Sequence, residues 1–123
     1  MWSKWESALA AIGSNGVTGE LDSAYARAFA RLENHYFFNG IFFESDGQLL
    51  NNAGLMRHVS GTIIQGRFDM ICPPASAYAL HKRWPASRLR MIGQAGHAVS
   101  EPGIAGALVE AMNQIAEQLS ERL

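Results

Sequence analysis

The chain has 123 residues, of which 48% are hydrophobic and 17% charged, a balance typical of one folded domain and not of a disordered segment. Its net charge of -1 comes from 10 basic and 11 acidic side chains that are well mixed, so we expect neither nucleic acid nor a membrane as a partner. The single cysteine excludes an internal disulfide and fits a reducing compartment, and no apolar run is long enough to cross a bilayer. A cytoplasmic location is therefore expected.

The first part of the sequence predicts helices. Apolar side chains recur at three- and four-residue steps over residues 2–12, which indicates an amphipathic helix. A second helix with the same period is expected to start behind Thr18 as its capping residue and to stop at Asn39. After a loop, a short helix is predicted around residues 49–58.

A different pattern follows. Residues 62–65 form a short β-branched run that predicts a buried strand, residues 75–83 predict a helix, and residues 88–92 predict a second strand. A last helix is expected from Ser100, with Pro102 in its first turn. This strand–helix–strand–helix order predicts an α/β fold with a parallel pair of strands.

An aspartate and a histidine each lie a few residues past one of these strands, Asp69 after the first and His97 after the second. Ligands bind outside the carboxyl ends of strands in open α/β sheets, and adjacent strands are about 4.8 Å apart, so we expect the two side chains to meet. A carboxylate on one ring nitrogen orients the histidine, whose other nitrogen can take a proton from a nucleophile. Taken alone, the pair fits catalysis and ordinary turn chemistry equally well.

The order aspartate then histidine is that of α/β-hydrolases, in which a serine in a G-x-S-x-G turn comes first. None of the serines in the printed sequence lies in such a turn. The segments around the pair read GRFDMICPPASAYALHKRWP and GQAGHAVSEPGI, and the helical part contains WSKWES and FARLENHYFFNGIFF. In this order they resemble the C-terminal portion of bacterial proline iminopeptidases (prolyl aminopeptidases), with Phe68 and Ala98 in place of the usual tyrosine and serine.

This resemblance implies a fold and a reaction. The fold is the C-terminal fragment of an α/β-hydrolase, namely its last two parallel strands and their helices, preceded by helices of the cap domain. Residues 1–48 would belong to the cap and residues 49–123 to the hydrolase core. The reaction is that of a serine exopeptidase that releases N-terminal proline from peptides without a cofactor or metal ion.

The resemblance also implies roles for single residues. Asp69 is similar to the triad acid and His97 to the triad base, while Glu6 and Glu33 resemble the cap glutamates that hold the free amino group of the substrate. A pair of carboxylates suits a cationic ligand, because each raises the pKa of the other when no cation is present. Cys72 is expected to lie near the site as a small buried side chain with no catalytic role.

Several expectations concern what the chain does not do alone. Because its acid and base have no G-x-S-x-G serine to activate, we expect it to be inactive alone and to need the N-terminal half of the hydrolase, or self-association, to cover its apolar faces. Two alternatives stay open: an inactive remnant that acts as a binding or self-associating module, and an α/β-hydrolase with another small substrate. We expect three aromatic side chains to pack within the cap, namely Tyr36, Phe37 and Phe38. Three histidines are expected to be structural or exposed, namely His35, His58 and His81.

Overall fold

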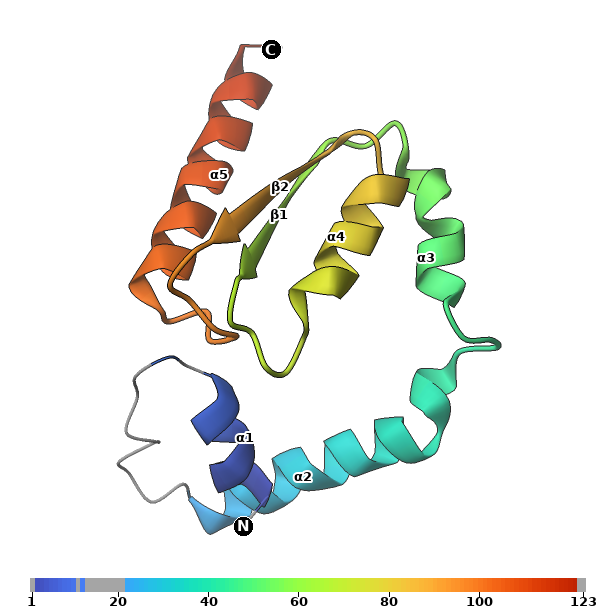
Figure 1. Ribbon diagram of the computed structural model, residues 1–123, viewed down its shortest axis with the longest axis vertical. Helices are drawn as coiled ribbons and strands as arrows, with labels where there is room; N and C mark the ends of the chain where they lie inside the picture. The colour runs from blue at the N-terminus through green and yellow to red at the C-terminus, as the bar shows by residue number, and fades with distance from the viewer. Residues whose placement is uncertain (1, 11, 13–21, 122–123) are drawn as a thin grey trace.

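A computed structural model describes residues 2–10, 12 and 22–121 of the chain. Figure 1 shows a helical arc, formed by the helices up to residue 56, that leads into an α/β unit formed by residues 61–120. In chain order the elements are α1 (Trp2–Ala10), α2 (Ser23–Phe38), the 3-10 turn η1 (Gly40–Phe42), α3 (Gln48–Asn52), the 3-10 turn η2 (Ala53–Met56), β1 (Gly61–Gly66), α4 (Pro74–Arg83), β2 (Ser87–Ile92) and α5 (Pro102–Ser120).

The two strands form the centre of the α/β unit. β1 and β2 pair in parallel, from Gly61 opposite Ser87 to Gly66 opposite Ile92. Helix α4 connects them, and α4 and α5 lie on either side of the strand pair (Figure 1). The parallel pair, the connecting helix and the last helix with Pro102 as its first residue confirm the prediction from the sequence.

The helical part differs from the prediction at one end. Helix α2 begins at Ser23, where the Asp22 side chain accepts a hydrogen bond from the Ala24 backbone N–H at 3.0 Å. The prediction of Thr18 as the cap of this helix is therefore wrong, and Thr18 itself lies outside the described residues. The predicted stop at Asn39 is confirmed, since the Asn39 side chain and backbone N–H both bind the carbonyl of His35.

The expected short helix around residues 49–58 is present as two pieces, α3 and the tighter turn η2, which ends at Met56. The strand over residues 62–65 was expected to be buried, but Thr62 is exposed and the other three side chains are only half-buried. Helices α4 and α5 cover β1 in the described part of the chain, and that cover is incomplete.

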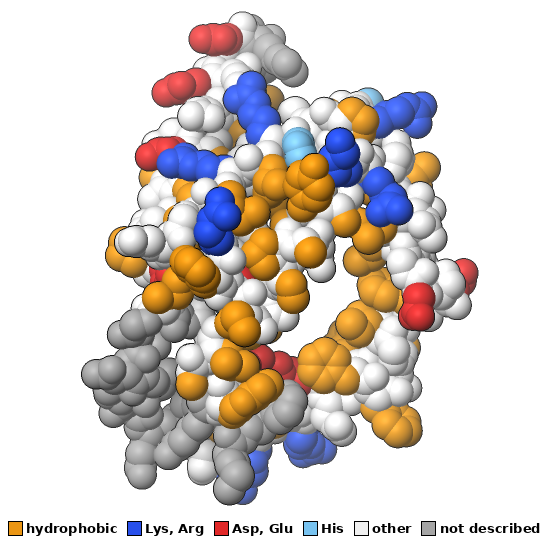
Figure 2. Space-filling view, viewed as in Figure 1, with side chains coloured by type: hydrophobic (Ala, Val, Ile, Leu, Met, Phe, Trp, Pro, Cys, Tyr) orange, Lys and Arg blue, Asp and Glu red, His pale blue; other side chains and the backbone are white. Residues whose placement is uncertain are grey.

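Much apolar surface is left open. Figure 2 shows an opening through the molecule, with hydrophobic side chains gathered along its rim. Large apolar side chains on the helical arc and on the loop after β1 are well exposed, among them Phe38 at 86%, Leu55 at 70% and Met70 at 70%. The division into a cap over residues 1–48 and a core over residues 49–123 stays a prediction. None of the described helices combines the length and the apolar character that a membrane span requires.

Candidate acid–base site

Asp69 and His97 meet at the carboxyl ends of the strands. Asp69 lies in the turn after β1 and His97 in the loop after β2, and the Asp69 Oδ2 to His97 Nδ1 distance is 3.0 Å. Asp69 is buried, with 7% of its surface exposed, whereas 42% of the His97 side chain is open to solvent. Since an ionised carboxylate only accepts hydrogen bonds, Nδ1 carries a proton and Nε2 is the basic nitrogen.

The Asp69 carboxylate is held by four donors. Oδ1 accepts from the backbone N–H groups of Ile71 at 3.0 Å and Cys72 at 2.8 Å, and Oδ2 accepts from Gln65 Nε2 at 3.1 Å as well as from His97. Burial alone would raise the pKa of Asp69, but the hydrogen bonds from Cys72, His97 and Ile71 outweigh it and hold that pKa below its ordinary value. The carboxylate is therefore ionised at neutral pH and fixed in one orientation.

Gln65 is a part of this site that the sequence did not indicate. Its Nε2 also donates to the carbonyl oxygens of Cys72 and Gly66, each at 3.1 Å, so one amide group joins the end of β1 to the far side of the Asp69 turn. The sequence offered only a weak signal, a polar residue next to the end of an apolar strand.

Gly66 permits the two strand-end loops to touch. A Cβ atom at this position would lie 2.0 Å from the Gly96 carbonyl oxygen and 2.6 Å from that of Ala95. The backbone N–H of Phe68 donates to the same Ala95 oxygen at 3.0 Å. A side chain at Gly66 would separate the loop that carries Asp69 from the loop that carries His97.

Glu6 and Glu33 also lie together, Glu6 on α1 and Glu33 on α2. Partial burial of Glu6 raises its pKa, and a side-chain hydrogen bond to Glu33 and the negative charge of Glu33 raise it further. A positive charge on His97, when its ring is protonated, acts in the opposite direction on the pKa of Glu6. The carboxyl group of Glu6 therefore holds its proton more tightly than an isolated carboxyl group does, and it lies within electrostatic reach of His97.

One cavity connects these groups. It measures about 260 Å³, and its lining residues are Glu6, Ser7, Ala10, Tyr25, Phe29, Ile71 and His97. His97 and Glu6 thus border the same space. Its aromatic wall comes from Tyr25 and Phe29, whose rings stack with centroids 5.9 Å apart. The helical period had placed both on the apolar stripe of α2 but did not indicate what they face.

The aromatic residues that follow along α2 point elsewhere. Tyr36 packs edge-on against Phe42 with ring centroids 5.7 Å apart, which fits the favoured packing role. Phe37 lines a separate hollow beside Glu33, and Phe38 lies in an open groove with residues of α2. None of the three borders the cavity at His97.

Cys72 is near the site, but the expectation that it is buried is wrong, because the residue is exposed. Partial desolvation of its thiol and then the charge of Asp69 raise the pKa of Cys72, so the thiol stays protonated at neutral pH and is a poor nucleophile. His35 and His58 are exposed, and His81 Nδ1 lies 2.9 Å from Ser87 Oγ. Among the residues that the structure describes, no cluster of three metal-ligating side chains is found.

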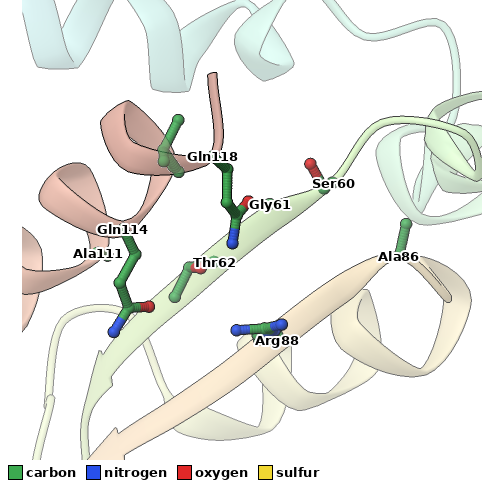
Figure 3. Close-up of a pocket in the computed structure, with 9 residues that line it drawn as sticks. Ser60, Gly61, Thr62, Ala86, Arg88, Ala111, Gln114 and Gln118 are labelled. Atoms are coloured by element: carbon green, nitrogen blue, oxygen red, sulfur yellow. The ribbon is translucent and has the colours of Figure 1, made fainter. Parts of the chain in front are cut away.

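A second hollow lies at the opposite end of the strands (Figure 3). It measures about 60 Å³ and opens between α5 and the amino ends of β1 and β2. Of the described residues that line it, Arg88 is the one charged residue, and none is an acid, a histidine or a cysteine. Since ligands of open α/β sheets bind at the carboxyl ends of strands, we assign the candidate site to the Asp69 and His97 end.

The helices around a parallel strand pair, with an aspartate and a histidine joined at its carboxyl end, have the architecture predicted from the sequence for the C-terminal part of an α/β-hydrolase. No known family profile matches the chain. The chain is 47% identical over 112 residues to a proline iminopeptidase of Arabidopsis thaliana, an alignment that covers 89% of this chain and 30% of the relative. It is 44% identical over 117 residues to that of Xanthomonas citri (94% and 37% covered) and 44% identical over 119 residues to that of Neisseria gonorrhoeae (96% and 37% covered).

The chain therefore matches the C-terminal portion of proline iminopeptidases, which confirms the resemblance seen in its motifs. It spans about a third of the length of these curated relatives.

Proposed function

We propose that the chain contributes the acid, the base and the amino-group receptor of a serine exopeptidase that releases N-terminal proline from peptides. One observation carries the proposal: His97, oriented by Asp69, borders the same cavity as Glu6, which is hydrogen-bonded to Glu33. A substrate whose amino group lies at Glu6 would place its first carbonyl group in the cavity that His97 borders. This arrangement suits removal of a single N-terminal residue.

In the proposed reaction, a serine from a segment outside the printed sequence attacks the carbonyl carbon of the N-terminal proline residue. His97 Nε2 takes the hydroxyl proton, and Asp69 stabilises the imidazolium through Nδ1. His97 then gives this proton to the leaving amide nitrogen, the C–N bond breaks, and a prolyl ester of the serine remains. Water attacks the ester with proton transfer through His97, which releases free proline and restores the serine hydroxyl.

Recognition of the amino terminus follows from the two glutamates. An N-terminal proline presents a secondary ammonium, whose charge would let Glu6 and Glu33 both ionise beside it. Tyr25 and Phe29 offer an apolar wall for the pyrrolidine ring. A blocked amino terminus brings no positive charge and leaves two carboxyl groups without a cation, so it should be rejected.

The proposed reaction requires neither a metal ion nor a cofactor. We place it in the cytoplasm, since the chain's one cysteine, Cys72, is an exposed free thiol that fits a reducing compartment.

The exposed apolar rim in Figure 2 supports a partner surface. The proposed cover is the N-terminal portion of the hydrolase, because the curated relatives extend well beyond the matched third. A second copy of this chain is the other candidate for covering the rim. A homodimer of this kind would favour the alternative that the chain is a self-associating binding module. Sedimentation of the chain alone and with the N-terminal portion of the Xanthomonas citri relative distinguishes a heterodimer from a homodimer.

Hydrolysis of a proline arylamide tests the proposed activity. We define the reconstituted enzyme as this chain joined behind the N-terminal portion of the Xanthomonas citri relative. The chain alone should show only background hydrolysis, and the reconstituted enzyme should release proline. Background activity of the reconstituted enzyme would refute the exopeptidase proposal, and hydrolysis by the chain alone would refute an external serine.

The double variant Glu6→Gln with Glu33→Gln tests the amino-group receptor. Two ester substrates report on it, a prolyl aryl ester and its cyclopentanecarbonyl analogue, which has the same ring size without the amine. The variant should lower the preference for the prolyl ester about 100-fold, the order expected for loss of a charged hydrogen-bonded pair. Glu117→Gln, on the exposed surface of α5, is the matched control. An unchanged preference would favour a hydrolase with another small substrate.

A further inference from the structure

The Glu101 side chain bridges two segments that are far apart in sequence. Its Oε1 accepts a hydrogen bond from the Ile12 backbone N–H at 2.7 Å, and its Oε2 accepts one from the Gly96 backbone N–H at 3.0 Å. Ile12 follows helix α1, and Gly96 directly precedes His97. One carboxylate therefore joins the end of α1 to the loop that carries the base.

A third bond reinforces this junction. The Ala98 backbone N–H donates to the Ala10 carbonyl oxygen at 2.6 Å. A Cβ atom at Gly96 would lie only 3.0 Å from that same oxygen, so the end of α1 rests directly on the loop. Both sequence neighbours of His97 are thus fixed, Ala98 to α1 itself and Gly96 to α1 through Glu101.

The bridge takes the place of an ordinary helix cap. Glu101 is the N-cap of α5, and its backbone carbonyl accepts from the N–H groups of Ile104 and Ala105, each at 2.9 Å. A side chain at this position usually bonds to its own helix, but the Glu101 side chain makes no such bond. Its two targets are both donors, so both oxygens must be acceptors. A carboxylate meets this requirement, whereas glutamine offers one acceptor and places an NH₂ group against the other donor.

We propose that Glu101 is a positioning residue that sets the distance between Glu6 on α1 and the base His97. The inference rests on the proposed function, in which Glu6 receives the amino group. His97 is also held by Asp69, so loss of the bridge loosens the docking of α1, which the Ala98 bond alone then holds to the loop, and leaves the acid–base pair in place. Glu101 thereby governs selectivity for free amino termini more than hydrolysis as such.

Hydrogen exchange on the chain alone tests the bridge without any assumption about activity. In Glu101→Gln, the Gly96 and Ile12 amides should exchange about tenfold faster, because one of them loses its acceptor and the other its charged partner. Glu101→Asp keeps the charge but is one methylene too short to reach both donors, so it should show the same change. Glu117→Gln on the same helix is the control. Unchanged exchange at both amides in both variants overturns the inference.

Kinetics of the reconstituted enzyme test the consequence. The measured quantity is the ratio of kcat/KM for the prolyl ester to kcat/KM for the cyclopentanecarbonyl ester. Glu101→Gln should lower this ratio about tenfold, with the second substrate little affected. A loss of equal size for both substrates would mean a merely structural role and overturn the inference. If the unmodified reconstituted enzyme is inactive, the proposed function fails, and the exchange experiment still decides whether Glu101 makes the bridge.

Discussion

The two halves of the candidate site are held in different ways. In the strand-end loops, Asp69 is buried and accepts four hydrogen bonds, and the loops touch where Gly66 has no side chain. In the helical arc, Glu6 and Glu33 lie on two helices that touch each other only lightly, and the rim of the arc exposes large apolar side chains.

Under the proposed function, this difference separates the hydrolytic chemistry from the recognition of the substrate's amino terminus. The position of Asp69 depends on hydrogen-bond donors close by in sequence and on His97, whereas the position of Glu6 depends on how α1 docks. We expect changes in the strand-end loops to abolish activity or folding, and changes in the arc to alter which substrate is chosen. Variants in each region test that contrast.

Asp69→Asn should give the largest effect. The asparagine amide presents a donor toward His97 Nδ1, or else loses the acceptor that fixes the tautomer, so Nε2 no longer serves as the base. We expect kcat of the reconstituted enzyme to fall about 10⁴-fold, the loss known for this replacement in a serine protease triad.

The exposed Asp46 provides a matched control, and Asp46→Asn should leave kcat unchanged. A decrease of less than about tenfold in Asp69→Asn would contradict the role of this carboxylate as the orienting acid.

Gly66→Ala tests the contact between the strand-end loops. The added methyl group would lie 2.0 Å from a backbone oxygen that cannot rotate away, so the loops must separate. We expect the free energy of unfolding to fall by about 3 kcal/mol or more. Urea denaturation of the chain alone, with an unchanged m-value, provides the measurement.

Gly106→Ala serves as the opposite case. A Cβ atom at Gly106, an exposed position on α5, meets nothing within 4 Å, and alanine should stabilise the helix by up to about 1 kcal/mol. Equal midpoints for the two variants would show that the close approach at Gly66 does not matter for stability.

Gln65→Leu should have a smaller effect. It keeps the side-chain size but removes the donor to Asp69 Oδ2 and to the Cys72 carbonyl. We expect about 1–2 kcal/mol of lost stability and a decrease in kcat of about tenfold, because the acid turns more freely while its backbone donors remain. Gln118→Leu, on the exposed surface of α5, is the control. An unchanged kcat in Gln65→Leu would show that the backbone donors alone orient Asp69.

The meeting of Asp69 and His97 could be predicted from the sequence because local sequence features determine it. Each side chain follows a recognisable strand, and parallel strands bring such positions together at one edge. Glu101 and Gln65 could not be assigned in this way, since their partners are backbone groups of distant or folded-back segments. No side-chain pattern marks such partners.

The helical arc shows the limits of periodicity. The period of α2 identified Tyr25 and Phe29 as apolar positions, but only the docking of α1 determines that they line a cavity. Periodicity also extended the helix too far toward its start, where Asp22 ends the pattern by capping. Cys72 was expected inside because cysteine is usually buried, yet its place here is set by its backbone bond to Asp69.

The smallest expected effect distinguishes the two regions by the sign of a pKa shift. Asp69 has a lowered pKa, so it stabilises the fold at neutral pH, and this contribution is lost as the pH falls below the ordinary aspartate pKa. Glu6 has a raised pKa, so the folded chain binds more protons than the unfolded chain. Its contribution therefore weakens the fold as the pH rises through the range above the ordinary glutamate pKa.

Glu33→Gln tests the origin of the Glu6 shift. It removes the neighbouring negative charge but keeps a side chain of equal size, so the pKa of Glu6 should move down toward its ordinary value, while that of Asp69 should not change. Carbon-13 NMR titration of the side-chain carboxyl groups in the chain alone measures both. Glu44→Gln, in an exposed turn, controls for the general loss of one charge. If Glu6 titrates identically with and without Glu33, partial burial alone raises its pKa. The two glutamates would then not act as the paired receptor that a substrate ammonium requires.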